Sequence, residues 1–278
     1  MKKMCFLGMF LLIVSCAKGT IWTVDNNSLS GQFTTIQAAY DSASTGDTLL
    51  ISGSPLSYGN ILIKKGLTLI GPGFNPQGLI TNSAYLNVIK LDTCLTNIVI
   101  SGFVVYKIII SENNISNIII RGNQVNDSLI INGGDTIDIY KNIFNFYLSS
   151  SSSVNINNHA NVLISNNIFS CPAGANAIIN SNQSSVIINN NIFTGHFMLI
   201  ELFFNVSNAQ FANNIFYGKS PSTATYSNFT NNISYGNIDF IGLNNTSTGV
   251  NNIYLDPQFM YTPIDNAMYQ FFFIMITD

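Results

Sequence analysis

Charge is scarce in this sequence. Only 8% of the 278 residues are Asp, Glu, Lys or Arg, and Arg121 is the sole arginine. A nucleic-acid-binding surface needs clustered lysines and arginines, so the composition excludes that class of protein. Intrinsic disorder is excluded as well, because disordered chains are poor in apolar residues, whereas 47% of this chain is hydrophobic.

Long apolar runs are missing from the N-terminal end. The apolar stretch at residues 5–14 follows two lysines and has ten residues, which is too short to cross a bilayer as a helix and is typical of a secretory signal. It leads into Val14-Ser15-Cys16, which resembles the lipobox of bacterial lipoproteins; an ordinary signal peptide is the alternative. We expect residues 1–15 to be a lipoprotein signal peptide, with a lipid on Cys16 that anchors the protein in a membrane. The expected location is the outer membrane or cell surface, or otherwise the extracellular space.

Cysteine is too rare to suggest a disulfide framework. Of the four cysteines, Cys5 lies in the expected signal and Cys16 is the expected lipid site, so only Cys94 and Cys171 are left to pair. An exported domain held together by disulfides usually has more.

What the sequence has instead is asparagine and isoleucine, with 40 residues of each. They recur in register, as in Ile-Ile-Ile-Arg-Gly-Asn at 118–123, Val-Leu-Ile-Ser-Asn-Asn at 162–167 and Val-Ile-Ile-Asn-Asn-Asn at 186–191. The last position of this motif falls at residues 103, 123, 142, 167, 191, 214, 232 and 252, seven gaps that average about 21 residues. A persistent period with unequal gaps is typical of a solenoid whose loops vary while its strands keep their register.

The pattern inside each repeat predicts strands. Apolar residues stand five and three positions before the Asn, as at Val162 and Ile164, and the residues between them vary, which is the alternation of a half-buried strand. A second short strand starts directly after the Asn, and a third follows in the middle of the remainder. We therefore expect three short strands per coil and about nine or ten coils.

The asparagines have a predicted role at the corner between the first two strands. Gly102 and Gly122 stand directly before the last position of the motif, where later repeats have Asn166, Asn190, Asn213 and Asn231, which predicts a positive φ there. Successive Asn side chains would lie about 4.8 Å apart and hydrogen-bond as a ladder. The predicted ladder consists of Asn123, Asn142, Asn167, Asn191, Asn214 and Asn232.

Three segments, 33–40, 46–51 and 67–71, resemble the start of right-handed parallel β-helix proteins of the pectin-lyase-like superfamily, and the later repeats are similar to the repeats of that group. The resemblance implies an all-β fold, with an N-terminal strand and capping helix in residues 16–44 and a right-handed parallel β-helix in residues 45–259. The expected helix has Ile36, Ala39, Tyr40 and Ala43 on one face.

Residues 260–278 are expected to be a C-terminal tail. Its last eight residues are mostly apolar and uncharged, which would be an aggregation hazard at an open solenoid end, so a truncated or frameshifted terminus is one hypothesis. A leucine-rich repeat is the alternative fold, but its spine would be Leu rather than Ile and each repeat would contain a helix-like segment.

The resemblance also implies where catalytic groups would lie. Lyases of the superfamily use Ca²⁺ held by Asp residues and an Arg or Lys base, and its glycosidases use paired carboxylates. The corresponding outward positions in this sequence are Ile109, Ile130, Asn155 and Ile179, and none of these side chains titrates. We therefore expect no metal site and no cofactor, with Ca²⁺ relevant only if the protein is a lyase.

Two weaker groups of charged residues remain. Glu112, Asp135 and His159 are expected in the same loop of three successive coils, where they would hold a cation or act as acid and base on a sugar; a solvated loop edge is the alternative. Arg121 and Asp138 fall on neighbouring coils, and we expect a cross-strand ion pair rather than a catalytic pair.

Several tyrosines, among them Tyr85 and Tyr106, would present rings that stack on sugars or would pack between loops. Three functions follow: binding of polysaccharide or adhesion at the cell surface, cleavage of polysaccharide as a lyase or hydrolase, and a structural role in the envelope. The expected partners are a glycan and, through Cys16, a membrane. The sequence specifies no oligomeric state.

Overall fold

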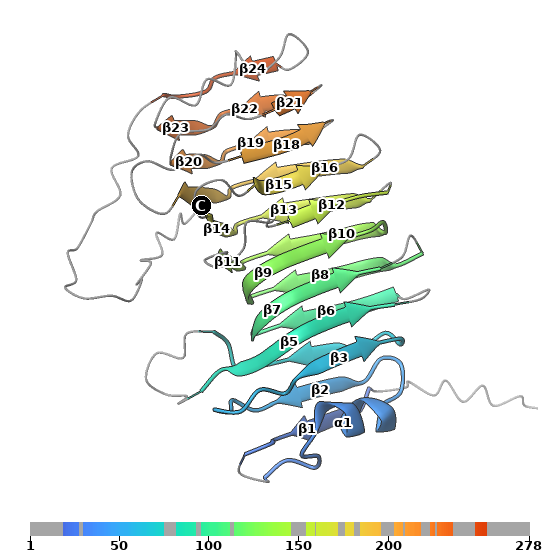
Figure 1. The fold of residues 1–278 in the computed structure, drawn as a ribbon. Coiled ribbons are helices and arrows are strands. Elements are labelled where there is room, and N and C mark those ends of the chain that lie inside the picture. The colour runs from blue at the N-terminus through green and yellow to red at the C-terminus, as the bar shows by residue number, and fades with distance from the viewer. Residues whose placement is uncertain are drawn as a thin grey trace, which may run out of the picture.

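A computed structural model describes residues 19–27, 30–74, 82–92, 96–111, 114–145, 154–158, 160–171, 176–180, 184–195, 203–207, 209–217, 223–225, 227–235 and 248–254. Their strands stack into two parallel sheets that wind into a solenoid (Figure 1). The fold is the right-handed parallel β-helix predicted from the sequence. None of the described helices is long and apolar enough to span a membrane.

The first sheet contains the predicted strand that precedes each Asn corner, and its eleven strands follow one another in chain order. They are β1 (Ile21–Val24), β2 (Thr48–Ile51), β4 (Thr68–Ile70), β6 (Thr96–Ser101), β8 (Ser116–Arg121), β10 (Asp135–Tyr140), β13 (Asn161–Ser165), β16 (Ser185–Asn189), β19 (Ala209–Ala212), β22 (Asn228–Thr230) and β24 (Thr248–Val250).

The second sheet contains the strands that follow the corner. They are β3 (Asn60–Ile63), β5 (Ala84–Leu91), β7 (Phe103–Ile110), β9 (Gln124–Ile131), β11 (Ile143–Asn145), β12 (Val154–Ile156), β14 (Ile168–Cys171), β15 (Asn176–Asn180), β17 (Ile192–Gly195), β18 (Phe203–Ser207), β20 (Ile215–Tyr217), β21 (Thr223–Thr225) and β23 (Ile233–Tyr235).

The expectation of three strands per coil is wrong for the early coils. There the second and third strands form one continuous strand of eight residues in each of β5, β7 and β9. From the next coil onward they are separate, because β9 pairs with both β11 and β12. No residue of β5, β7 or β9 has a positive φ, so the chain continues through these strands without a turn.

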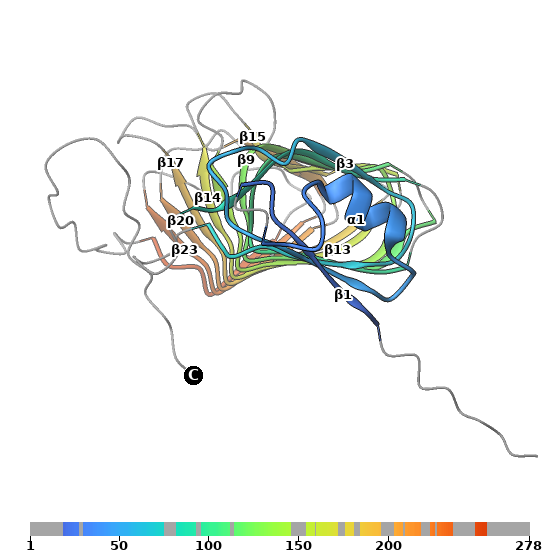
Figure 2. The ribbon, with the colours of Figure 1, turned by 90° about the horizontal axis from the view of Figure 1, so that it is seen from below.

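The predicted capping helix is present as α1 (Ile36–Ser42). The Thr35 side chain accepts a hydrogen bond from the Ala38 N–H at its N-terminus, and the helix buries Ile36, Ala39 and Tyr40. It lies across the N-terminal end of the solenoid (Figure 2), where it covers apolar side chains that the first coil would otherwise expose.

Asp47 holds the N-terminal strand to the first coil. Its carboxylate accepts hydrogen bonds from the Ser44 N–H at 2.7 Å, the Trp22 Nε1–H at 3.0 Å and the Thr20 N–H at 2.7 Å. These three donors favour the ionised form and lower the pKa of Asp47 below its ordinary value.

The asparagine ladder runs through the corner between the two sheets, and its side chains are buried. The Asn167 Nδ2 donates to the Asn191 Oδ1 at 3.0 Å and to the Ile139 carbonyl at 2.8 Å. The same pattern of bonds repeats from Asn123 to Asn232 and extends to the Asn252 Oδ1. The sequence predicted the ladder but not its burial, which lets each amide also bond to main-chain carbonyls.

Positive φ angles occur at the corner as predicted, at Gly102, Gly122, Asn166, Asn190, Asn213 and Asn231. Lys141 and Asn251, for which none was predicted, also have positive φ. A second set, which the sequence pattern did not reveal, lies near the start of the first-sheet strands and includes Asn97, Asn117 and Thr136.

Aromatic rings stack in the interior of the late coils. Phe144, Phe169, Phe193 and Phe216 form a column with successive ring centroids 4.7, 4.7 and 4.9 Å apart. The interior of the early coils is mainly aliphatic, for example at Ile89, Ile108 and Leu129. The two halves of the solenoid therefore differ in what fills the core.

Candidate functional site

The four positions at which the resemblance implies catalytic groups are in register, but none of them is a titratable residue. Ile109, Ile130, Asn155 and Ile179 lie in register on neighbouring strands of the second sheet. Calcium requires several carboxylate or carbonyl oxygens, and the described part of the chain contains no group of three or more His, Cys, Asp or Glu residues placed to bind a metal. The described residues therefore do not fit the Ca²⁺ site that the resemblance implies for a lyase.

The three weak candidates do not form a described cluster. Asp135 is the first residue of β10 rather than part of a loop, is exposed, and accepts a hydrogen bond from the Asn161 Nδ2 at 2.7 Å. Glu112 and His159 lie outside the described residues, as does the expected lipid site Cys16. A role for Asp135 with either residue stays a prediction.

The expected ion pair between Arg121 and Asp138 is wrong. Arg121 is opposite Tyr140 in the register of β8 and β10, whereas Asp138 is opposite Ile119. The Arg121 Nη1 donates to the Tyr140 Oη at 3.2 Å instead. Arg121 and Asp138 lie on neighbouring coils, as expected, but they are offset by two residues along the strands and do not face each other.

A shallow hollow of about 320 Å³ lies on the outer face of the second sheet. It is formed mainly by β5, β7 and β9, together with the segment before β3. Its lining consists of Pro55, Ser57, Tyr85, Leu86, Asn87, Val104, Tyr106 and Asn126. Tyr85 is 45% exposed and Tyr106 is 46% exposed, although both belong to strands. Leu86 and Val104 also line it and are buried, so the hollow combines accessible rings, apolar residues and amide groups.

The amide and phenol groups of the hollow have hydrogen-bonding capacity left over. The Asn126 Oδ1 accepts a bond from the Gln124 Nε2 at 2.9 Å, and the Asn87 Oδ1 accepts one from the Ser57 Oγ at 3.3 Å. Among the described residues, neither the Nδ2 groups of these two asparagines nor the hydroxyls of the two tyrosines have a partner. The hollow therefore offers neutral donors to a ligand.

A β-bulge places the side chains next to the hollow. Val105 pairs with Val125, but the next pair is Lys107 with Ser128, so β9 has one residue more than β7 between these pairs. Because of the extra residue, two consecutive side chains of β9 lie on the outer face. Asn126 lines the hollow and Asp127 lies beside it. Bulges are frequent next to functional sites because they redirect a side chain in this way.

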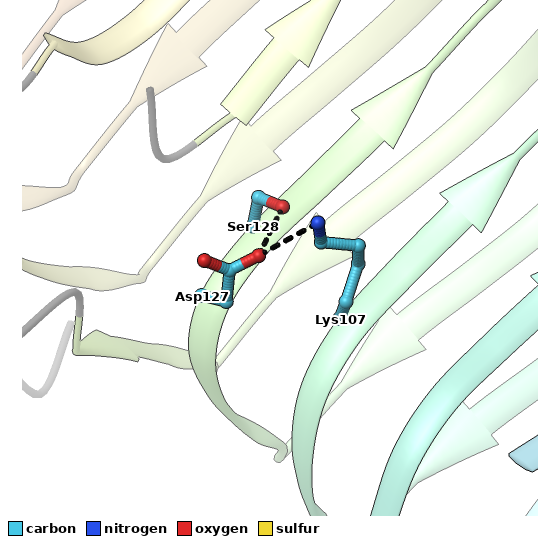
Figure 3. Close-up of polar contacts among 3 residues, drawn as sticks. All are labelled: Lys107, Asp127 and Ser128. Atoms are coloured by element: carbon cyan, nitrogen blue, oxygen red, sulfur yellow. Dashed lines mark hydrogen bonds and ion pairs between the residues drawn. The ribbon is translucent and has the colours of Figure 1, made fainter. Parts of the chain in front are cut away.

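Asp127 forms an ion pair with Lys107 across the bulge (Figure 3). The Lys107 Nζ lies 2.9 Å from the Asp127 Oδ2, and their side chains are 30% and 7% exposed. The Ser128 Oγ donates to the same carboxylate oxygen at 2.9 Å. This pair was not predicted, although residues 107 and 127 are one repeat apart and each follows the corner position by four residues.

No protein-family model matches the sequence, and no curated protein is found to match it. Among solved structures, an alginate lyase from Paenibacillus sp. str. FPU-7 is similar, with a TM-score of 0.44 and 12% sequence identity over 78% of this chain and 91% of that chain. A likeness at this level carries no argument about activity. The assignment of the fold rests on the parallel strand order of the two sheets, which is that of a parallel β-helix.

Proposed function

We propose that this protein is an exported, surface-anchored β-helix that binds a polysaccharide on the outer face of its second sheet. The observation that carries the proposal is the pair of exposed rings, Tyr85 and Tyr106, beside the shallow hollow over β5, β7 and β9. The anchor is a lipid on Cys16, after removal of a signal peptide at residues 1–15, and is supported by the sequence motif.

The arrangement of the hollow suits a sugar chain. A pyranose ring has an apolar face that packs on an aromatic ring and hydroxyls at its rim that need hydrogen-bond partners. The tyrosines supply the rings, and Asn87 and Asn126 supply amides at the side of the hollow. A shallow, open hollow on a long regular face admits the middle of a polymer, whereas a small free ligand is usually enclosed more completely.

The charges near the hollow favour binding over cleavage. Polysaccharide lyases and hydrolases need a base or an acid with an accessible proton-transfer atom. The ammonium group nearest to the tyrosines along the chain, on Lys107, is paired with Asp127. Cleavage by a lyase or hydrolase is therefore the second candidate, and a purely structural role in the envelope is the third.

The test is retention of the purified mature chain on a panel of immobilised polysaccharides, with ultraviolet absorbance of unsaturated product measured in parallel. The double variant Tyr85→Ala/Tyr106→Ala should lose about tenfold or more in affinity, because each stacked ring contributes roughly 0.5–1.5 kcal/mol. Tyr254→Ala is the matched control, since Tyr254 is 46% exposed and lies beyond β24 at the other end of the solenoid.

Equal retention of the double variant and the parent would remove the hollow from the proposal. Formation of unsaturated product would favour the lyase. Absence of both retention and product would leave the structural role.

A further inference from the structure

We infer that the hollow selects a neutral polysaccharide and rejects uronate-type acidic chains. The inference rests on the proposed function, and it adds the class of ligand. The observation behind it is that the hollow has an uncharged lining and a neighbouring cation whose charge is already neutralised.

All eight lining residues are uncharged. The polar groups with spare capacity are the amide Nδ2 atoms of Asn87 and Asn126 and the hydroxyls of Tyr85 and Tyr106. Such groups pair well with hydroxyl, ether and acetamido oxygens. A carboxylate bound by neutral donors alone would lose hydration without gaining an opposite charge, which is unfavourable.

Lys107 is the cation placed to change this preference, because it follows Tyr106 directly in β7. Its ammonium group is committed to Asp127 at 2.9 Å. The Asp127 side chain is only 7% exposed. Removing its partner would leave a nearly buried charge unpaired, which is destabilising. An incoming carboxylate would therefore compete with Asp127 for Lys107 and would be repelled by it.

Lys90 is the other cation on the outer face of these strands. It stands opposite Ile109 in the register of β5 and β7 and is partly buried. It lies three positions beyond Asn87 in β5, about 10 Å along the strand at 3.3 Å per residue. At physiological ionic strength that is more than a screening length, so Lys90 adds little attraction for an anion in the hollow.

The bulge in β9 produces both parts of this arrangement. It directs Asn126 into the hollow and Asp127 onto Lys107, although the two are consecutive in the chain. In a regular strand consecutive side chains point to opposite faces. Asp127 is thus a positioning and charge-neutralising residue rather than one that contacts the ligand.

The experiment compares retention on neutral polymers (a β-glucan, a mannan and a galactan) and acidic polymers (polygalacturonate and alginate) at low and high salt. The parent chain should be retained on a neutral polymer with an affinity that salt does not change. Asp127→Asn should gain about tenfold in affinity for an acidic polymer at low salt, because Lys107 is then uncompensated, and should lose the gain at roughly 1 M salt, where the screening length is about 3 Å.

The double variant Lys107→Met/Asp127→Asn is the control, since it removes both charges. It should retain the parent's neutral binding and show no acidic binding, and it tests the inference even if Asp127→Asn alone fails to fold. Tyrosine-dependent, salt-sensitive retention of the parent on an acidic polymer would overturn the inference and leave the proposed function intact. Retention of the parent on no polymer would overturn the proposed function itself, and the inference with it.

Discussion

In the second sheet, β5, β7 and β9 are eight residues long, whereas the strands from β11 to β23 have three to five residues. The early coils keep long backbone ladders around an aliphatic core. The late coils have shorter strands and contain the phenylalanine column, and the buried asparagine ladder runs through them from Asn123, directly before β9. Side-chain stacks between coils thus accompany the division of each second-sheet strand into two shorter strands.

The two regions also differ in what their outer faces present. The early coils contain the hollow with Tyr85 and Tyr106 and the bulge with its ion pair, whereas the described late strands have a register shift between β15 and β18. A ladder side chain must meet its equivalent one coil away, so the corner tolerates little irregularity. The bulge lies in the middle of β9, three residues beyond the first ladder residue Asn123. Regular stacking at the corner and irregularity on the open face are therefore compatible within one coil.

The largest expected effect in the late coils comes from Asn167→Ala. The Asn167 side chain makes five hydrogen bonds, two of them with the main-chain carbonyls of Ile139 and Ser165 and three with the neighbouring ladder residues Asn142 and Asn191. Its removal leaves two or three buried groups without partners at about 2 kcal/mol each, so the free energy of unfolding should fall by roughly 4–6 kcal/mol. Chemical denaturation followed by circular dichroism measures this.

Asn161→Ala is the control for the ladder variant, because Asn161 is exposed and its side chain bonds to Asp135 at the surface. It should cost less than about 1 kcal/mol. Equal losses in the two variants would mean that the ladder contributes no more than a surface hydrogen bond, and the contrast between early and late coils would not hold.

A smaller effect is expected from the aromatic column. Phe169→Leu removes stacking on both Phe144 and Phe193 while keeping an apolar side chain, and should cost about 2–3 kcal/mol. Phe103→Leu in the early coils is the matched variant, since Phe103 is equally buried but belongs to no ring stack among the described residues. It should cost about 1 kcal/mol. Thermal unfolding of the two variants side by side decides whether the stack adds to burial alone.

Much of this architecture was predictable because it repeats. Val162, Ile164 and Asn167 each have equivalents one period away, so burial and the corner could be assigned from spacing alone. The capping helix was predictable because Ile36, Ala39 and Tyr40 fall on one helical face.

The site was less predictable because it depends on departures from the repeat. The extra residue of β9 next to Asp127 shifts the local register, and a pattern averaged over coils does not show it. The exposure of Tyr106 depends on the neighbouring residues of β5 in the preceding coil. The ion pair predicted for Arg121 was wrong because Asp138 is offset from it by two residues along the strand. Such information lies in the pairing between coils rather than within any one of them.

The last prediction concerns protonation of Asp47 in acid. We expect it to affect the N-terminal coil and to leave the late coils folded. The pKa of Asp47 is lowered by its bonds to the Ser44 N–H, the Trp22 Nε1–H and the Thr20 N–H. Its ionised form therefore stabilises the N-terminal coil above the ordinary value of 3.8, and this contribution is lost as the pH falls below that value through the lowered pKa. The amides of the ladder do not titrate.

Because Trp22 is the sole tryptophan, its fluorescence should change in this pH range while the far-ultraviolet circular dichroism of the solenoid persists. Asp47→Asn should show the altered fluorescence already at pH 7 and no such acid transition. Fluorescence and circular dichroism changing together, with one midpoint in the parent chain, would instead mean that the N-terminal and late coils unfold as a single unit.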